Sequence, residues 1–323
     1  MPYFIGILSR LLIVESESGG LRVGELVIAL LRKMPQELLP VLPDLLHAMV
    51  RRLDTAKTVT FAQSLILPFA FLIKDQCDVV LDLLQSTRVS RGGDEAGNGS
   101  VEVSGLQVLA SKWAENAETI QGYWAQRMCT FALTRLLGTW AQGGSRGSAL
   151  EEILVPGDAI PDTSDLIRTR SRALVNPQKF VSLPFPIRAL KMLLSDWEHT
   201  ARGSPALSDG EDGGDGMPTD KEDDEWDDDE DDEIFRSSRR NDDDAFLSDL
   251  LNGGTGVGRD FDDEEGDGDE DAKEDAVYRM DIRAYLCFFF QEISQNPRAS
   301  LLAQGLTGEE QRRLRNIMSG VRT

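Results

Sequence analysis

The sequence predicts an all-α protein built as an α-solenoid, with a long acidic insertion near its C-terminal end. Three observations support this prediction. Apolar residues recur at helical spacing along most of the 323 residues, no stretch alternates with period two between hairpin turns, and the acidic residues are concentrated in one window. Helix pairs that are too thin to bury their own apolar faces are typical of a solenoid. A compact helical bundle is the alternative.

Each helix is predicted from a stripe of apolar residues at i, i+3 or i+4, and i+7, a spacing that places them on one face. We expect the aromatic and methionine residues on such stripes to pack in the core rather than to contact a ligand. These residues are Trp113, Tyr123, Trp124, Met128, Trp197 and Phe288–Phe290. The stripes are Ala62, Leu65, Phe69 and Leu72; Leu106, Leu109, Ala110 and Trp113; Trp124, Met128 and Phe131; Ile187, Leu190, Leu194 and Trp197; and Ile282, Leu286, Phe289 and Ile293.

The helices are expected in adjacent pairs, with breaks at glycines and prolines. The irregular spacing between pairs fits HEAT-like repeats better than tetratricopeptide units. Thr307 and Glu310 have the spacing of a capping box, which would open the last helix. The expected helices are 21–34 with 41–54, 57–74 with 75–86, 101–117 with 119–138, and then 183–200, 278–295 and 307–319.

These breaks predict the domain organisation. Residues 1–141 should form HEAT-like helix pairs, and residues 142–182 a long inter-helix loop with basic residues and some local order. Residues 183–202 should form one solenoid helix, residues 203–277 a disordered acidic insertion, and residues 278–323 the C-terminal HEAT helices. Loops longer than about 12–15 residues are usually functional or disordered.

The negative charge belongs to the insertion and not to the rest of the chain. Residues 209–275 hold 31 of the 56 Asp and Glu residues and 6 of the 34 Lys and Arg residues. That window therefore carries a net charge of −25 and the remainder +3, out of −22 overall. Blocks of like charge this dense do not form a packed core.

A polyanion of this kind can attract and hold a basic protein, in competition with the phosphates that such a protein would otherwise bind. A solvated loop that only maintains solubility is the alternative. The candidate cargo-binding residues are Asp223, Asp224, Glu225, Trp226, Asp227, Asp228, Asp229, Glu230, Asp231, Asp232, Glu233, Asp262, Asp263, Glu264 and Glu265.

A short basic run lies in the expected loop before the insertion, at Arg168, Arg170 and Arg172. Runs of this type can bind nucleic acid or act as localisation signals. Because the chain is so negative overall, we expect these arginines to make intramolecular contacts or to bind an acidic partner. Direct binding of nucleic acid is not expected, since a net negative charge repels phosphate.

A calcium loop is the first metal site to consider in the insertion. Asp267, Asp269 and Asp271 match the opening spacing of an EF-hand. However, Ala272 stands where the EF-hand needs glycine, and Tyr278 stands where it needs a bidentate glutamate. The sequence therefore predicts no metal site here.

An enzyme is not expected either. The chain has two histidines, no phosphate-binding or dinucleotide-binding glycine pattern and no nucleophile elbow, so we predict no catalytic residues and no cofactor. Cys77, Cys129 and Cys287 are far apart in the sequence, which suits a reducing compartment. The longest apolar stretch, 61–73, is shorter than the ~20 residues that cross a bilayer. We therefore expect a soluble intracellular protein without membrane insertion.

Several segments in their order along the chain resemble the karyopherin-β family, also called the importin-β family, of nuclear import receptors. Residues 106–133 are similar to HEAT repeats of this family. Four further segments resemble the C-terminal region of such receptors. They are DLIRTRSRALVNPQKFVSLPFPIRALKMLLSDW (165–197), the acidic DEWDDDEDDE, YRMDIRAYLCFFFQEISQNP (278–297) and the closing LTGEEQRRLRNI.

The resemblance implies a right-handed superhelix of HEAT (armadillo-like) repeats. It also implies a carrier that shuttles between cytoplasm and nucleus, passes transiently through the nuclear pore by contacts with nucleoporins, and takes basic cargo such as core histones and ribosomal proteins. Ran-GTP would regulate cargo release. The acidic stretches Asp220–Glu233 and Asp260–Asp271 would be the cargo- or Ran-responsive element.

Family members are several-fold longer than this chain, and their principal Ran-binding repeats are N-terminal. We therefore expect the chain to be the C-terminal part of a longer product, with further in-frame HEAT repeats encoded upstream of Met1. A free-standing acidic histone chaperone or scaffold without a transport cycle is the alternative. Absence of such upstream repeats would favour it.

Overall fold

The computed structural model describes residues 2–14, 16–91, 101–160, 180–202 and 270–320. The chain divides into two units. The first comprises residues 1–204 and 275–323, and the second residues 205–274. The described part of the second unit is the short helix α12 (Glu270–Lys273) with Glu274.

The first unit is predominantly helical. It also contains two 3-10 turns, η1 (Glu17–Gly20) and η2 (Ala117–Thr119). Its helices are α1 (Pro2–Ile13), α2 (Val23–Lys33), α3 (Pro35–Leu38), α4 (Leu42–Asp54), α5 (Val59–Ser86), α6 (Gly105–Asn116), α7 (Tyr123–Gln142), α8 (Gly144–Glu152), α10 (Phe185–Arg202), α13 (Ala276–Arg279), α14 (Ile282–Ser294), α15 (Ala299–Gln304) and α16 (Gly308–Met318).

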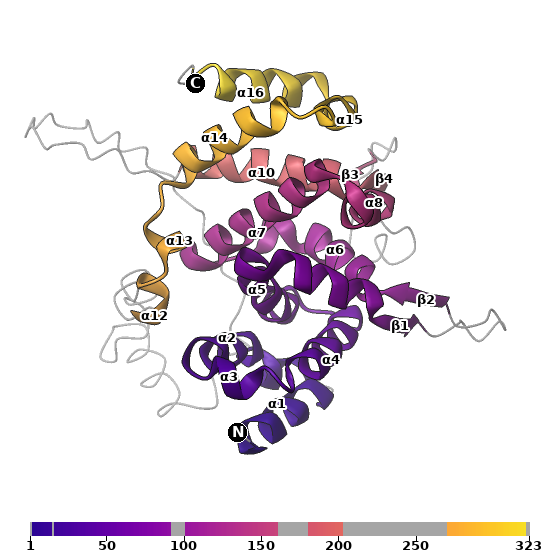
Figure 1. Cartoon of the computed structure of the whole chain (residues 1–323), viewed down its shortest axis with the longest axis vertical. Coiled ribbons are helices and arrows are strands. Elements are labelled where there is room, and N and C mark those ends of the chain that lie inside the picture. The colour runs from indigo at the N-terminus through magenta and orange to yellow at the C-terminus, as the bar shows by residue number, and fades with distance from the viewer. Residues whose placement is uncertain (1, 15, 92–100, 161–179, 203–269, 321–323) are drawn as a thin grey trace, which may run out of the picture. The chain divides into compact units, whose positions relative to one another are not determined.

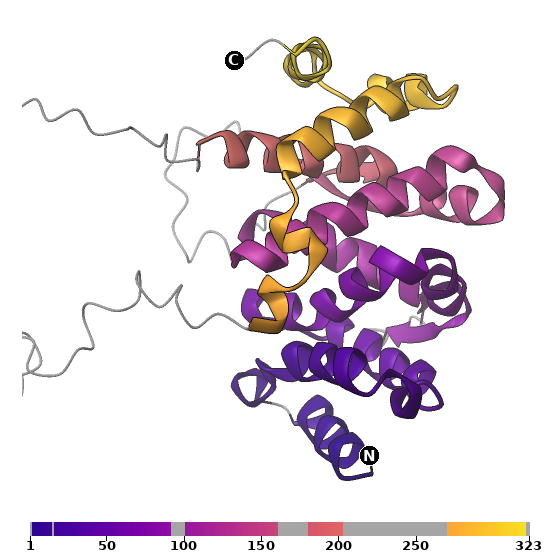
Figure 2. The same cartoon turned by 60° about the vertical axis from the view of Figure 1, so that its left-hand side comes forward.

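The long helices form two columns. In one column α2, α5, α7 and α14 pack in succession, and in the other α1, α4, α6, α10 and α16 do so. Across the columns α5 packs on α6, α7 on α10, and α14 on α16. Figures 1 and 2 show these layers following one another in chain order, from indigo to yellow. The predicted fold class, an all-α solenoid of HEAT-like helix pairs, is confirmed.

The core is continuous from layer to layer and contains the predicted stripes. Most stripe residues are buried, and Phe69, Trp113 and Leu286 have no exposed surface. The remaining stripe residues are partly buried and pack against the same core. These are Leu72, Trp124, Phe131 and Ile187. The predicted core role is therefore confirmed for Trp113, Trp124, Met128, Trp197, Phe289 and Phe290. It is wrong for Tyr123 and Phe288, which are 50% and 67% exposed.

The break expected between the helices 57–74 and 75–86 is present close to its predicted position. The backbone at Gln76 is not helical (φ −129°, ψ 40°), so α5 consists of two helical segments joined across a kink. Its buried face continues through the bend with Ile73, Cys77 and Val80. The partner of α5 in its layer is therefore α6, and α7 is paired with α10.

Residues 142–182 are more regular than the long loop expected from the sequence. They contain α8 and the strand β3 (Leu154–Ala159), which pairs antiparallel with β4 (Phe180–Pro184), with Val155 opposite Leu183. A similar ladder joins β1 (Arg88–Arg91) to β2 (Val101–Ser104) between α5 and α6. Each strand is too short to produce the sustained alternation that predicts a strand. Both ladders lie in connections between the two helices of one layer.

The acidic insertion predicted over 203–277 lies outside the described residues up to position 269. The remainder, 270–277, contains α12 and the start of α13. Within the described ranges, no helix has both the length and the apolarity of a membrane span. In the same ranges, no three His, Cys, Asp or Glu side chains are grouped in a way that could hold a metal ion.

Candidate functional site

The residues predicted to bind cargo, at 223–233 and 262–265, lie outside the part of the chain that the structure describes. The same holds for Arg168, Arg170 and Arg172, in the connection from β3 to β4. Their roles therefore stay predictions. The structure does describe the two places where the acidic insertion meets the helical unit: α10 before it, and Asp275 with α13 after it.

The side chain of Asp275 is 6% exposed and lies between two cations. Its Oδ2 is 3.6 Å from Nη2 of Arg32 on α2, and its Oδ1 is 3.4 Å from Nζ of Lys74 on α5. Oδ1 also accepts a 3.1 Å hydrogen bond from the backbone N–H of Val277, which caps α13. One carboxylate therefore joins α2, α5 and α13.

Aromatic rings support the two cations that hold Asp275. The guanidinium of Arg32 lies 5.4 Å from the ring centre of Phe71 and 5.1 Å from that of Trp124. Nζ of Lys74 lies 5.1 Å from the centre of the Phe71 ring. A cation over an aromatic face is attracted by the ring quadrupole. The rings therefore hold both positive charges in place for a carboxylate.

The chain after Asp275 is held by α7. Arg127 donates hydrogen bonds to the carbonyls of Val277 (3.4 Å) and Met280, and its guanidinium lies 4.2 Å from the ring centre of Tyr123. Tyr123 in turn meets Tyr278 edge to face at 4.9 Å. We call residues 275–281 the strap, and Figures 1 and 2 show it in orange, running past α7 to α14.

The two ends of the insertion are attached to different layers of the helical unit. Before the insertion, the chain leaves along α10, which packs against α14 and α16. After it, the chain is bound at Asp275 to α2 and α5, the first two helices of the other column. The strap then leads from there to α14. The insertion therefore leaves the helical unit at the layer of α7 and α10 and returns to it at the layers of α5 and α2.

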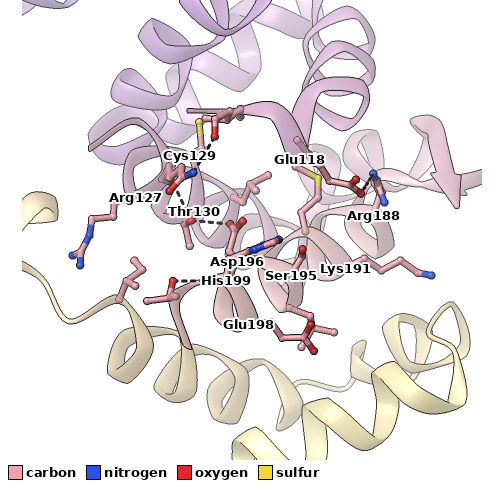
Figure 3. A pocket seen from close by; sticks show the side chains of 18 of the residues that line it. Glu118, Arg127, Cys129, Thr130, Arg188, Lys191, Ser195, Asp196, Glu198 and His199 are labelled. Atoms are coloured by element: carbon pink, nitrogen blue, oxygen red, sulfur yellow. Dashed lines mark hydrogen bonds and ion pairs between the residues drawn. The ribbon is translucent and has the colours of Figure 1, made fainter. Parts of the chain in front are cut away.

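A cavity of about 450 Å³ lies beside α10 and is lined by residues of α7, α10 and α16, among others. In Figure 3, Asp196 of α10 and Thr130 of α7 point toward one another. The Thr130 hydroxyl lies 2.8 Å from Oδ2 of Asp196 and 2.9 Å from the carbonyl of Gln126. The cavity thus borders a carboxylate that packs between two helices.

Burial raises the pKa of Asp196 from 3.8 to about 6, against the smaller opposing effects of the Thr130 hydrogen bond and of His199. A hydroxyl has one proton to donate, and Thr130 has two acceptors within reach. When Asp196 is protonated, it can donate to Oγ of Thr130 while Thr130 donates to Gln126. The neutral acid therefore satisfies this hydrogen-bond chain better than the carboxylate does.

The charged groups on the wall of the cavity pair with one another. Lys191, whose side chain is 5% exposed, forms ion pairs with Asp158 and with Glu310 (3.1 Å). Arg188 lies 3.8 Å from Glu118 and 4.0 Å from Asp158. These pairs join α10 to η2, to β3 and to α16. These ion pairs are structural contacts that hold the elements together.

The cavity offers no activated nucleophile among its described residues. Burial raises the pKa of the Cys129 thiol, with the negative charge of Asp196 adding to the shift. The thiolate is the reactive form of cysteine, so Cys129 is kept in its inert form. The contacts described at this cavity are packing and ion-pair contacts between α7, α10 and their neighbours.

Sequence reasoning missed the binding site of Asp275. Within the run of acidic residues that precedes it, Asp275 has no distinguishing neighbour. Its partner Lys74 lies 201 positions earlier in the chain, and Arg32 lies earlier still. Neither cation stands in a basic run. A single sequence contains no signal that would have connected them.

No known protein-family profile matches the chain. The chain is 28% identical to importin subunit beta-5 of Saccharomyces cerevisiae over 191 residues, which cover 59% of this chain and 17% of that protein. It is 26% identical to importin-9 of Drosophila melanogaster over 196 residues, or 60% of this chain and 18% of that protein. The chain thus spans less than a fifth of these relatives. The resemblance to importins is confirmed.

Proposed function

We propose that this chain is the C-terminal part of a nuclear import receptor of the importin-β family, similar to importin-9. In this proposal it binds basic cargo and carries it between cytoplasm and nucleus. The observation that supports it best is the similarity to two importins in a chain whose layered helices are interrupted by an acidic insertion. The proposed cargo class comprises core histones and ribosomal proteins.

The physical basis of cargo binding is electrostatic. In the insertion, aspartate and glutamate greatly outnumber lysine and arginine, so it attracts proteins rich in lysine and arginine. Both of its ends are held on the helical unit, at α10 and at the strap, so the polyanion stays tethered to the solenoid. Attraction between exposed charges is screened by salt. We therefore expect cargo affinity to fall steeply as the salt concentration rises.

Ran-GTP and nucleoporins are the further partners of this proposal. The relatives matched are named importins, and a transport receptor must engage both the pore and the release signal. We propose that the main Ran-GTP site belongs to repeats outside this chain. Binding of a nucleoporin fragment to the purified chain tests whether this chain by itself can contact the nuclear pore.

The cargo proposal is tested by the affinity for core histones. In one variant, the Asp and Glu residues at 223–233 and 262–265 are replaced by Asn and Gln. We expect its affinity to fall by about tenfold or more at physiological salt, because cation–polyanion contacts are lost. The matched control is a variant with Glu37, Asp44 and Glu102, which are exposed on the helical unit, neutralised in the same way. Unchanged histone affinity in the first variant would refute the role of the insertion.

The boundary of any deletion matters for this test. A deletion that runs to residue 275 also removes the carboxylate that joins α2, α5 and α13. Loss of binding would then have two causes. A deletion that ends at residue 269 leaves the strap intact and tests the acidic residues alone.

A further inference from the structure

We propose that the strap, residues 275–281, is a releasable clamp that ties together layers of the solenoid that are not neighbours, with Asp275 as its charged anchor. The surface that it contacts carries Arg32, Lys74 and Arg127 beside aromatic rings. The chemistry of this surface selects a segment that begins with a carboxylate and continues into the short helix α13. This inference concerns the helical unit and does not depend on the proposed function.

The clamp changes the connectivity of the solenoid. In a solenoid each repeat contacts its immediate neighbours, so stability is a sum of local terms. The strap adds long-range contacts, since its first residue binds α2 and α5, its middle binds α7, and its end continues into α14. Along that column α2 and α14 are separated by α5 and α7. Motion of α14 relative to α2 is therefore restrained directly.

The anchor is specific because several groups converge on one buried carboxylate. Asp275 has two cations and one backbone N–H around it, at 3.1–3.6 Å. Removal of one member of a buried ion pair leaves an uncompensated charge, which is strongly unfavourable. Next to the anchor, Val277 is 2% exposed and is part of the core. These contacts explain why Asp275, and not another acidic residue of the preceding run, is bound at this position.

The clamp is releasable because its contacts are mainly polar and partly reached by solvent. The side chains of Arg32 and Lys74 are 15% and 17% exposed, and their distances to Asp275 exceed those of strong charge-assisted hydrogen bonds. Lys74 has a second carboxylate, that of the exposed Asp75, at 3.6 Å. Salt screens such partly buried pairs less than exposed ones, so it weakens the anchor only moderately while the apolar core of the two columns stays packed.

Release would have two consequences. The chain after the acidic insertion would no longer be bound at α2 and α5. Arg32, Lys74 and Arg127 would at the same time become exposed on the face of the α2–α5–α7 column. One ionic anchor thus controls both the restraint on the solenoid and the exposure of these cations.

Hydrogen exchange of the full chain, read by mass spectrometry, tests the clamp. We expect Asp275→Asn to raise exchange of the strap amides, 276–281, by roughly tenfold or more at low salt, because the buried ion pairs are lost. Exchange in the middle of α5 and α7 should not change. The matched control is Asp281→Asn at the other end of the strap, which keeps a good capping residue at α14. The Asp281 carboxylate accepts from the backbone N–H groups of Arg283 and Ala284 and has no part in the anchor at Arg32 and Lys74. Asp281→Asn should leave the strap protected.

Two further measurements keep the test decisive. In the unaltered chain, a rise from about 0.05 to 0.5 M salt should raise strap exchange selectively but less than Asp275→Asn does, since salt screens partly buried pairs less than exposed ones. The double variant Asp275→Asn with Lys74→Gln should show no more strap exchange than Asp275→Asn alone, because both changes break the same pair. Strap exchange that is unchanged in Asp275→Asn, or that rises only together with α5 and α7, would overturn the clamp.

Discussion

At the residue scale, the packing of α10 against α7 brings a carboxylate into a poorly solvated position. Asp196 faces Thr130, and burial raises the pKa of Asp196 to about 6. A raised carboxyl pKa means that the folded state binds the proton more tightly than the unfolded state does. The stability contributed by this group is therefore greatest at low pH and declines as the pH rises through the folded pKa.

This gives a prediction with a defined sign. We expect Asp196→Asn to be more stable than the unaltered chain at pH 7.5, by on the order of 1–3 kcal/mol, because the asparagine amide donates to Thr130 without a charge. At pH 5 the difference between the two proteins should shrink. Urea unfolding of both proteins at the two pH values measures it. An offset that is identical at pH 5 and 7.5 would contradict the raised pKa.

A second residue-scale prediction concerns close packing of α2 on α5. A Cβ atom on Gly24 would lie 1.9 Å from the carbonyl oxygen of Ser64, and the Gly24 N–H donates to Oγ of Ser64 at 2.9 Å. We expect Gly24→Ala to lower the free energy of unfolding by about 1–3 kcal/mol or more, since the backbone of α5 must move.

Gly138 is the matched control for Gly24, because it lies inside α7 and a Cβ atom added there would meet no other atom within 4 Å. Gly138→Ala should raise the free energy of unfolding by about 0.5–1 kcal/mol through helix propensity. Thermal or urea unfolding reports both changes. Equal effects of the two substitutions would show that α2 and α5 do not approach so closely at Gly24.

At the element scale, capping chemistry and apolar spacing predicted where most helices begin and end. The capping box predicted at Thr307 and Glu310 is present, and it opens α16. Short-range patterns of this kind depend on neighbouring residues alone, so one sequence is sufficient to reveal them. The two short ladders depend on packing between elements. They could not be predicted in the same way.

The capping box gives the prediction at this scale. Thr307→Ala should destabilise α16 by about 1 kcal/mol, because the Glu310 N–H loses its acceptor. Thr307→Ser keeps the hydroxyl and is the control that should retain stability. Hydrogen exchange of the first turn of α16 distinguishes the two variants. Faster exchange in both, or in neither, would exclude the hydroxyl as the stabilising group.

At the scale of the whole molecule, the core of the helical unit is built from residues on both sides of the insertion. Its two columns are held by apolar contacts from layer to layer, while the negative charge of the chain is concentrated in the insertion. We therefore assign stability of the fold and attraction of basic partners to different parts of the chain.

This separation can be tested directly. Replacement of residues 203–269 by Gly and Ser, residue for residue, should leave the helical circular dichroism and the urea midpoint close to those of the unaltered chain. The physical reason is that a flexible neutral linker preserves both attachment points and the strap. A large fall in the urea midpoint would show that the insertion contributes to the folded core.

The sequence by itself determined the helical class, the apolar faces, the helix caps and the location of the negative charge. All of these depend on spacings of a few residues, because helical periodicity and capping are local. The tertiary structure decided that α5 is paired with α6, and that Asp275 binds between Arg32 and Lys74. Those outcomes depend on which distant surfaces meet, and an acidic run contains nothing that distinguishes the residue that will be buried.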